Sequence, residues 1–246
     1  MQIIFLGTNG WYDTKTGNTP CVFIETKTHN IIIDAGNGFY KVSAYLKNKK
    51  PTHLFISHLH LDHIEGLHTL PQIKTIDKLN LFVYKGMKKY ILSFLKEPYT
   101  ANINQLDFSV EISELSEGRY SLPYLLEIKP LQHSVPVMGL RFEVEEKIIT
   151  YCSDTGICKN SEYLAKEADI LIHECTWRIP KNSNWGHVTS KEVALLAKKA
   201  KVKRLYLTHF AADDFVNLQQ RKEAEKKARK IFPKTFAAKD NLVVNL

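Results

Sequence analysis

Three histidines and one aspartate lie within the six residues from His58 to His63. They follow the apolar run 53–56, which the pattern predicts to be a buried strand. In an extended chain His58, His60 and Asp62 would project to the same side, so the two histidines could grip one cation. If a helix begins near Asp62, that carboxylate and His63 would turn towards a second cation. One loop could therefore serve two metals.

These side chains have a structural alternative that must be weighed. A single histidine beside a strand is usually a satisfied surface or half-buried residue. Four ligand-type side chains at this spacing are different, because without a cation they would crowd polar groups where burial is costly. Imidazole and carboxylate are the ligands that zinc and similar divalent ions accept. The stretch therefore predicts metal binding.

Three further ligand-type residues come directly after predicted strands. They are His133, Asp154 and His209. Each has a structural explanation when taken singly. Together they are what a two-metal site formed by the 58–63 stretch still lacks, and loops on a rigid sheet commonly gather ligands from distant parts of a chain.

The composition is that of an ordinary globular protein. The chain has 246 residues, of which 44% are hydrophobic and 24% charged, enough for one large domain or two small ones. No apolar run reaches the length of a membrane span, and the first residues lack the features of a signal peptide, so we expect a cytoplasmic protein without membrane contact. The four cysteines form no CxxC pair, and we expect inert thiols.

The net charge of +8 favours anionic partners, nucleic acid among them. Lysine-rich helices that face solvent would give the same total. The heavily charged segment 217–231 fits that second explanation.

Strand and helix patterns alternate along the chain, which predicts a mixed α/β architecture in a single domain, 1–246. A capping box at Thr189 to Glu192 predicts the start of one helix. Residues 98–120 show no clear pattern. The predicted strands are 2–6, 21–25, 30–34, 53–56, 79–84, 125–131, 139–144, 148–152, 168–174 and 203–207, and the predicted helices are 39–46, one ending near 71, 87–95, 162–166, 190–200 and 217–231.

Four segments resemble, in order and content, the metal motifs of the metallo-β-lactamase superfamily: Ser57 to His63, Gln132 to Pro136, Ser153 to Gly156 and Leu207 to Phe210. Three more look like the ribonuclease Z type phosphodiesterases: Phe5 to Thr8, His173 to Trp177 and Gly186 to Thr189. The resemblance covers nearly the whole chain.

The resemblance implies a four-layer αββα sandwich that binds two divalent cations, zinc or alternatively manganese. His58, His60 and His133 would hold the first cation, Asp62, His63 and His209 the second, and Asp154 would bridge them. The implied reaction is hydrolysis of a phosphodiester by a hydroxide between the two metals.

Three residues would act on the reacting groups in that reaction. Asp62 would also hold the attacking water by a hydrogen bond. His187 would contact the scissile phosphate or protonate the leaving oxygen, and Glu174 would orient His187.

One departure from the family concerns the substrate. Members that process tRNA carry a protruding arm between the third histidine motif and the bridging aspartate. Here 20 residues separate His133 from Asp154, enough for one hairpin over 139–152. We therefore expect an RNA 3′ end or a small or cyclic nucleotide as the phosphodiester. The family also implies a possible homodimer.

Two other functions remain open. The same site could hydrolyse a lactone, thioester or β-lactam carbonyl, although such a reaction needs no histidine on the phosphate side. A basic nucleic-acid-binding protein without catalysis is the other alternative.

The roles of two loops are also undecided from the sequence. Asp34 could cap, bind or support the structure. The loop 10–13 could present aromatic rings to a base or pack them in the core.

Overall fold

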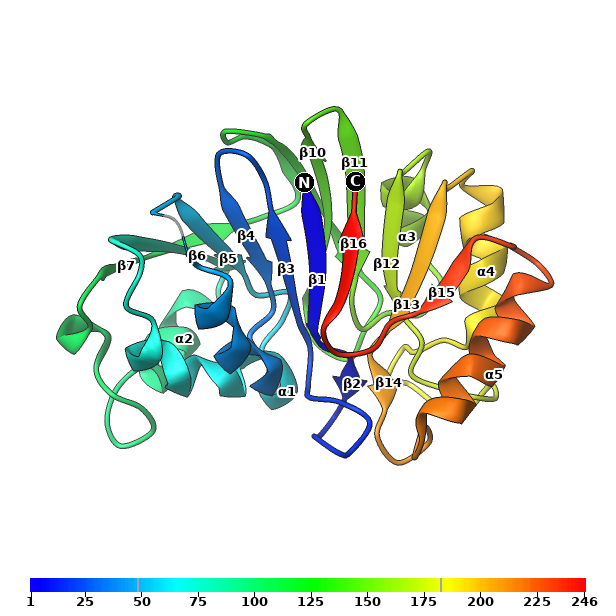
Figure 1. Ribbon diagram of the computed structural model, residues 1–246, viewed down its shortest axis with the longest axis horizontal. Helices are drawn as coiled ribbons and strands as arrows, with labels where there is room; N and C mark the ends of the chain where they lie inside the picture. The colour runs from blue at the N-terminus through cyan, green and yellow to red at the C-terminus, as the bar shows by residue number, and fades with distance from the viewer. Residues whose placement is uncertain (48, 182) are drawn as a thin grey trace. The chain divides into compact units, whose positions relative to one another are not determined.

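Two seven-stranded mixed sheets organise the chain in the computed structural model, which describes residues 1–47, 49–181 and 183–246 (Figure 1). The chain divides into two compact units, each containing one of these sheets. Unit 1 comprises residues 1–8, 17–115 and 240–246, and unit 2 comprises residues 9–16 and 116–239.

The sheet of unit 1 has the strand order β16-β1-β3-β4-β5-β6-β7, antiparallel from β16 to β4 and parallel from β4 to β7. Its strands are β1 (Gln2–Gly7), β3 (Cys21–Glu25), β4 (Asn30–Ile33), β5 (Thr52–Phe55), β6 (Lys78–Tyr84), β7 (Ser109–Leu115) and β16 (Leu242–Asn245). Its helices are η1 (Asn37–Ala44), α1 (Leu61–Ile64), η2 (Glu65–Gln72), α2 (Lys88–Phe94) and η3 (Ile103–Gln105).

One face of this sheet packs against the helices of unit 1. Alternate residues such as Ile4 and Leu6 of β1 join Phe39 and Val42 of η1 in one hydrophobic cluster. Burial of each such side chain stabilises the fold by about 1.5–3 kcal/mol. The strands thereby form a rigid base for the loops that leave their ends.

Gly36 lets two of these loops approach closely. A side-chain Cβ on Gly36 would lie 2.2 Å from the carbonyl oxygen of Asp62. In addition, the backbone N–H of Ala35 donates a hydrogen bond to the carbonyl of His63 at 2.9 Å. The loop after β4 therefore fixes the position of the segment that carries the predicted metal ligands.

The sheet of unit 2 has the order β15-β13-β12-β11-β10-β9-β8, and β2 and β14 form a separate parallel pair. The strands are β2 (Asn9–Gly10), β8 (Gly118–Ser121), β9 (Leu125–Leu131), β10 (Val137–Val144), β11 (Lys147–Cys152), β12 (Ile170–Glu174), β13 (Arg204–Thr208), β14 (Phe210–Ala211) and β15 (Thr235–Ala237). The helices are α3 (Lys159–Ala165), α4 (Ser190–Lys199) and α5 (Leu218–Arg229).

Helices α4 and α5 lie side by side next to the parallel strands of unit 2 (Figure 1). Val193 of α4 and Ala224 of α5 share a cluster with Leu205 of β13. The predicted capping box is present, because the Glu192 carboxylate accepts hydrogen bonds from the backbone N–H and the hydroxyl of Thr189. The start of α4, which follows the His187 segment, is thus fixed.

A two-residue turn joins β10 to β11. Its central residues, Glu145 and Glu146, have φ angles of 49° and 60°, as a type I′ hairpin turn requires. The segment between His133 and Asp154 therefore holds this hairpin and no larger insertion. The predicted absence of an arm at this place is confirmed.

Each predicted strand is present, and the α/β class is confirmed. The helix predicted at 39–46 is instead a 3-10 helix, η1, that begins at Asn37 next to two glycines. Residues 98–120 contain η3, β7 and most of β8. The division into one domain stays a prediction. Among the described residues, no helix has both the length and the apolar run needed to cross a bilayer.

Candidate functional site

The ligand-rich loop of unit 1 runs from the end of β5 into α1. Helix α1 begins at Leu61, so Asp62 and His63 belong to its first turn. Nε2 of His58 lies 3.0 Å from Nδ1 of His60, and Nε2 of His63 lies 3.6 Å from Oδ2 of Asp62. Ligand atoms around a tetrahedral zinc at 2.0–2.1 Å are about 3.3 Å apart. Both pairs are therefore spaced as neighbouring ligands of a cation.

Asp34, at the end of β4, supports this loop from behind. It is fully buried and has a φ of 60°. Its carboxylate accepts hydrogen bonds from the backbone N–H of Ser57 at 2.7 Å, from the Ser57 hydroxyl at 2.9 Å, and from Nδ1 of His63 at 2.9 Å. Ser57 Oγ also lies 3.1 Å from Nδ1 of His58. Such contacts orient histidine ligands through the nitrogen that does not face the metal.

The role of Asp34 was left open by the sequence, and the structure assigns it to support of the loop. The signal that could have identified it is an acidic residue at the end of a strand next to the histidine strand. Ser57 comes directly before the first histidine, and the sequence predicted no separate role for it. A serine there has no distinctive spacing, so only the fold reveals its part.

In unit 2 the Asp154 carboxylate lies between two predicted ligands. Its Oδ1 is 3.1 Å from Nε2 of His209, and its Oδ2 is 3.9 Å from Nε2 of His133. Each carboxylate oxygen thus faces a different imidazole. This is the arrangement that a carboxylate shared by two cations requires.

His209 follows β13 with a φ of 52°, a backbone conformation that is uncommon for residues other than glycine. Its Nδ1 lies 3.0 Å from the hydroxyl of Thr176. A Cβ on Gly10 would lie 2.5 Å from Cε1 of the His209 ring. Thr176 and Gly10 therefore set the orientation of this imidazole, and sequence reasoning did not assign that role to either residue.

His187 and Glu174 form a partly buried pair beside these residues. Nδ1 of His187 lies 2.8 Å from Oε1 of Glu174, which is fully buried at the end of β12. Ligand-type atoms of His187, Asp154 and His209 lie within 4.8 Å of one another. The structure thus brings His187 and Glu174 into the same cluster as predicted ligands of unit 2.

The donor sets fit divalent metals. Five of the seven predicted ligands are buried, and the second ring nitrogen of three of the histidines contacts a serine, threonine or aspartate side chain. Unit 1 contains the predicted ligands His58, His60, Asp62 and His63, and unit 2 contains His133, Asp154 and His209.

The cysteines take no part in this chemistry. All four are free thiols, and Cys21 and Cys175 are fully buried. Burial raises the pKa of both thiols well above the ordinary value, so they remain protonated. Cys21 and Cys175 are packing residues.

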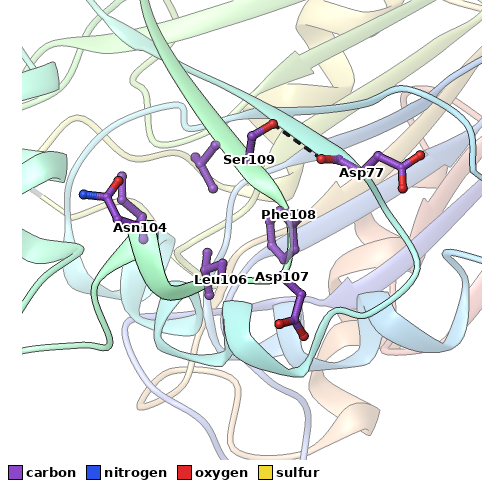
Figure 2. A pocket seen from close by; sticks show the side chains of 8 residues that line it. Asp77, Asn104, Leu106, Asp107, Phe108 and Ser109 are labelled. Carbon is purple, nitrogen blue, oxygen red and sulfur yellow. Dashed lines mark hydrogen bonds between the residues drawn. The ribbon is translucent and has the colours of Figure 1, made fainter.

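A hollow away from these residues lies at the start of β7 in unit 1 (Figure 2). The Ser109 hydroxyl donates to the backbone carbonyl of Asp77 at 3.4 Å, and the carboxylates of Asp77 and Asp107 pair with Lys49 and Lys74. These acids are therefore neutralised by solvated lysines. The hollow is lined by Asp77, Ile103, Asn104, Leu106, Asp107, Phe108, Ser109 and Val110, and none of these is a predicted ligand.

Comparison with known families decides the wider classification. A family model described as a beta-lactamase superfamily domain matches residues 29–210. The chain belongs to the beta-lactamase superfamily. The prediction of a metal-dependent hydrolase is confirmed by this family. The cluster of histidine and aspartate residues supports divalent metal binding, while the assignment of individual ligands stays a prediction.

Individual relatives agree with this placement. Ribonuclease Z of Bacillus mycoides is 27% identical over 305 aligned positions, which take in 98% of this chain and 97% of the relative. Among solved structures, the metallo-beta-lactamase fold protein YhfI from Bacillus subtilis has a TM-score of 0.81 at 19% identity and covers 99% of both chains. The short form of human tRNase Z has a TM-score of 0.77 at 22% identity and covers 100% of this chain and 99% of its own. The predicted metallo-β-lactamase fold is confirmed.

Proposed function

We propose that this chain is a dinuclear metal-dependent phosphodiesterase of the ribonuclease Z type. The observation that carries the proposal is the pair formed by His187 and the buried carboxylate of Glu174, 2.8 Å apart, in the same cluster as Asp154 and His209. Hydrolysis of a carbonyl compound needs no such histidine. Departure of an alkoxide from phosphorus does need a proton donor.

The metal ligands in this proposal are the seven residues that the resemblance implies. His58, His60 and His133 would hold one cation and Asp62, His63 and His209 the other, with Asp154 shared between them. The donor set fits zinc, with manganese as the alternative. Two such cations lower the pKa of a water molecule and neutralise charge that grows on the phosphoryl group.

The chain's own residues would then perform three tasks. Asp62 would accept a hydrogen bond from the attacking water and so aim its lone pair at phosphorus. His187, held through Nδ1 by Glu174, would present Nε2 to the phosphate and give a proton to the leaving oxygen. Glu174 would stabilise the positive charge of the imidazolium, because its fully buried carboxylate is in contact with the partly buried His187 ring.

The short β10–β11 hairpin points to small substrates. The alignment with the Bacillus mycoides enzyme spans 305 positions, whereas this chain has 246 residues, so the relative carries several dozen residues without a counterpart here. Short RNA 3′ ends and small or cyclic nucleotides are therefore the proposed substrates. A cytoplasmic location and a homodimer complete the proposal, and light scattering would test the dimer.

A substrate panel tests the proposal. Zinc-loaded and manganese-loaded protein would be assayed with bis-p-nitrophenyl phosphate and with a set of lactones and thioesters. We expect cleavage of the phosphodiester and little turnover of the carbonyl compounds. Strong lactonase activity without phosphodiester cleavage would reverse this ranking, and RNA binding by metal-loaded protein without cleavage would favour the binding protein.

A second panel defines the substrate. It would compare a tRNA precursor bearing a 3′ trailer, a short RNA, and 2′,3′- and 3′,5′-cyclic nucleotides. We expect the short RNA or a cyclic nucleotide to be cleaved faster than the tRNA precursor. Preference for the precursor would show that a short β10–β11 hairpin is compatible with tRNA processing.

A further inference from the structure

The histidine cluster of unit 2 forms a continuous row of rings. The ring centroids of His133 and His187 are 5.1 Å apart, and those of His187 and His209 are 5.9 Å apart. His187 occupies the middle of this row. The two ends of the row, His133 and His209, therefore lie on either side of a phosphate held by His187.

At one end of the row stands Trp185. Its side chain is 57% exposed, and its ring centroid is 6.4 Å from that of His133. Gly186, with a φ of 72°, turns the chain sharply between Trp185 and His187. A large apolar ring is therefore held in solvent two residues from the proposed phosphate-binding histidine.

At the other end lies the loop of β2, which carries Trp11 and Tyr12. Gly10 of this loop abuts the ring of His209, as described above. Trp11 is 67% and Tyr12 43% exposed, and their rings meet edge-on at 5.2 Å. The prediction that these rings could instead pack in the core is wrong.

The backbone of this loop is strained. Trp11 has a φ of 77°, and the N–H of Tyr12 donates to the carbonyl of Gly10 at 3.1 Å. This is the geometry of the rare γ-turn with a positive φ, and such strain is retained mainly where function uses it. The strain here places the indole of Trp11 on the surface.

A buried arginine keeps the loop in this conformation. Arg221 of α5 is 2% exposed, and its guanidinium donates to the side chains of Asn9 and Thr16. The Asn9 amide in turn donates to the carbonyl of Tyr12 at 3.1 Å. The loop is thus rigid at its base, while its aromatic rings lie outside.

We infer that Trp11 and Trp185 are stacking surfaces for nucleobases, one on each side of a phosphate bound at His187. This inference rests on the proposed phosphodiesterase function and names the residues that would hold the nucleoside part of its substrate. Base–aromatic stacking accepts any base, since every base has a π-face. The site would therefore favour nucleotides over simple phosphate esters with little preference for sequence.

Two esters with the same leaving group test the inference. Thymidine 5′-(p-nitrophenyl phosphate) and methyl p-nitrophenyl phosphate differ only in the group that carries the base. The thymidine ester carries one base, which can stack on one of the two tryptophans. In either Trp185→Ala or Trp11→Ala we therefore expect kcat/KM for the thymidine ester to fall about tenfold or more, the effect of one lost stack. In that variant the methyl ester should change less than about twofold, because the lost ring contacts the base and not the atoms that the two esters share.

Conservative and matched variants sharpen the test. Trp185→Phe and Trp11→Phe should restore most of the thymidine activity. Tyr163→Ala removes an exposed ring of α3 in the same unit and should leave both esters unchanged. If the alanine variants at 11 and 185 cleave the thymidine ester as the unmodified protein does, the inference is wrong and the phosphodiesterase proposal stands.

A binding measurement separates the two proposals. Metal-free protein would be titrated with thymidine 5′-monophosphate while tryptophan fluorescence is recorded, and Trp11→Phe/Trp185→Phe is the comparison. We expect quenching that disappears in the double variant, where Trp177 is the remaining tryptophan. Quenching without hydrolysis of either ester would support stacking and defeat the phosphodiesterase proposal, whereas equal quenching in the double variant would defeat stacking.

Discussion

Among single residues, Glu174 connects several segments of the unit 2 cluster. Its Oε1 accepts from the backbone N–H of Thr155 as well as contacting His187, and its Oε2 accepts from the N–H groups of Thr176 and Val188. One carboxylate thus joins the segments that carry Asp154, His187 and the threonine behind His209. Its position at the end of a fully buried strand makes these contacts possible.

Replacing His187 with alanine removes the proposed proton donor. We expect phosphodiesterase kcat to fall by about 10² to 10⁴ while the protein keeps its bound metals. Steady-state assays would measure kcat, and metal analysis of the same preparation would measure the bound metals. His68→Ala, which removes an exposed histidine of unit 1, is the matched control.

Two results would contradict this role of His187. Unchanged turnover would remove it from the mechanism. Loss of metal together with activity would make it a ligand, which its place within 4.8 Å of Asp154 and His209 would then explain.

Asp34→Asn tests the support behind the first histidine loop. The amide keeps the shape of the side chain but turns an N–H group towards Ser57 or Nδ1 of His63, where the carboxylate accepted hydrogen bonds. We expect metal affinity to fall about 10- to 100-fold. Competition with a chromophoric chelator would measure it, with the exposed Asp77→Asn as control. Equal affinity in both variants would limit Asp34 to a role in folding.

At the level of elements, the β2 loop depends on helix α5 through Arg221. Arg221→Met keeps the apolar stem near the Phe210 ring, 4.6 Å from the guanidinium, but removes the donors to Asn9 and Thr16. We expect a loss of about 1–3 kcal/mol in the free energy of unfolding, because buried acceptors lose their partner. Urea unfolding would measure it, and Lys222→Met on the exposed face of α5 should change it little. Equal stability of the two variants would show that the loop holds its own conformation.

The elements differ in how far the sequence predicts them. The alternation in Leu125–Leu131 and the apolar first half of Ile170–Glu174 identify strands, because burial on a sheet requires such patterns. The 3-10 helix η1 and the three-residue strand β15 lack such a pattern, since they owe their form to neighbouring elements. The predicted ligands were recognisable by residue type and spacing. Their supports, Ser57, Thr176 and Gly10, were not, because they act through contacts between segments that are distant in sequence.

For the molecule as a whole, His53 makes stability depend on pH. It is buried on β5, and its ring makes edge contacts with those of Phe55 and Phe82. Burial, and secondly the neighbouring His29, lower the pKa of His53 from 6.5 to about 4. The unfolded chain therefore takes up a proton first as the pH falls from 6.5 towards 4, and this favours unfolding within that range.

His53→Phe measures this contribution. Between pH 6.5 and 4 the free energy of unfolding should fall by about 1–2 kcal/mol less in the variant than in the unmodified chain. Solvent screening makes this difference smaller than the shift in the pKa of His53 alone would give. Urea unfolding in the presence of a chelator at several pH values would record the difference between the two proteins. His68→Phe, at an exposed position, should follow the unmodified chain. Parallel pH profiles for His53→Phe and the unmodified chain would disprove the role of His53.

The charge of the β10–β11 turn affects which large ligands can bind near it. Two acidic residues form its tip, and Glu146 is exposed, so a polyanion that approached this end of the hairpin would be repelled. A longer, basic loop inserted at the same two positions would change which macromolecules bind. It would leave the predicted metal ligands in place. Grafting such a segment between residues 144 and 147 is thus a route to redirect recognition independently of reactivity.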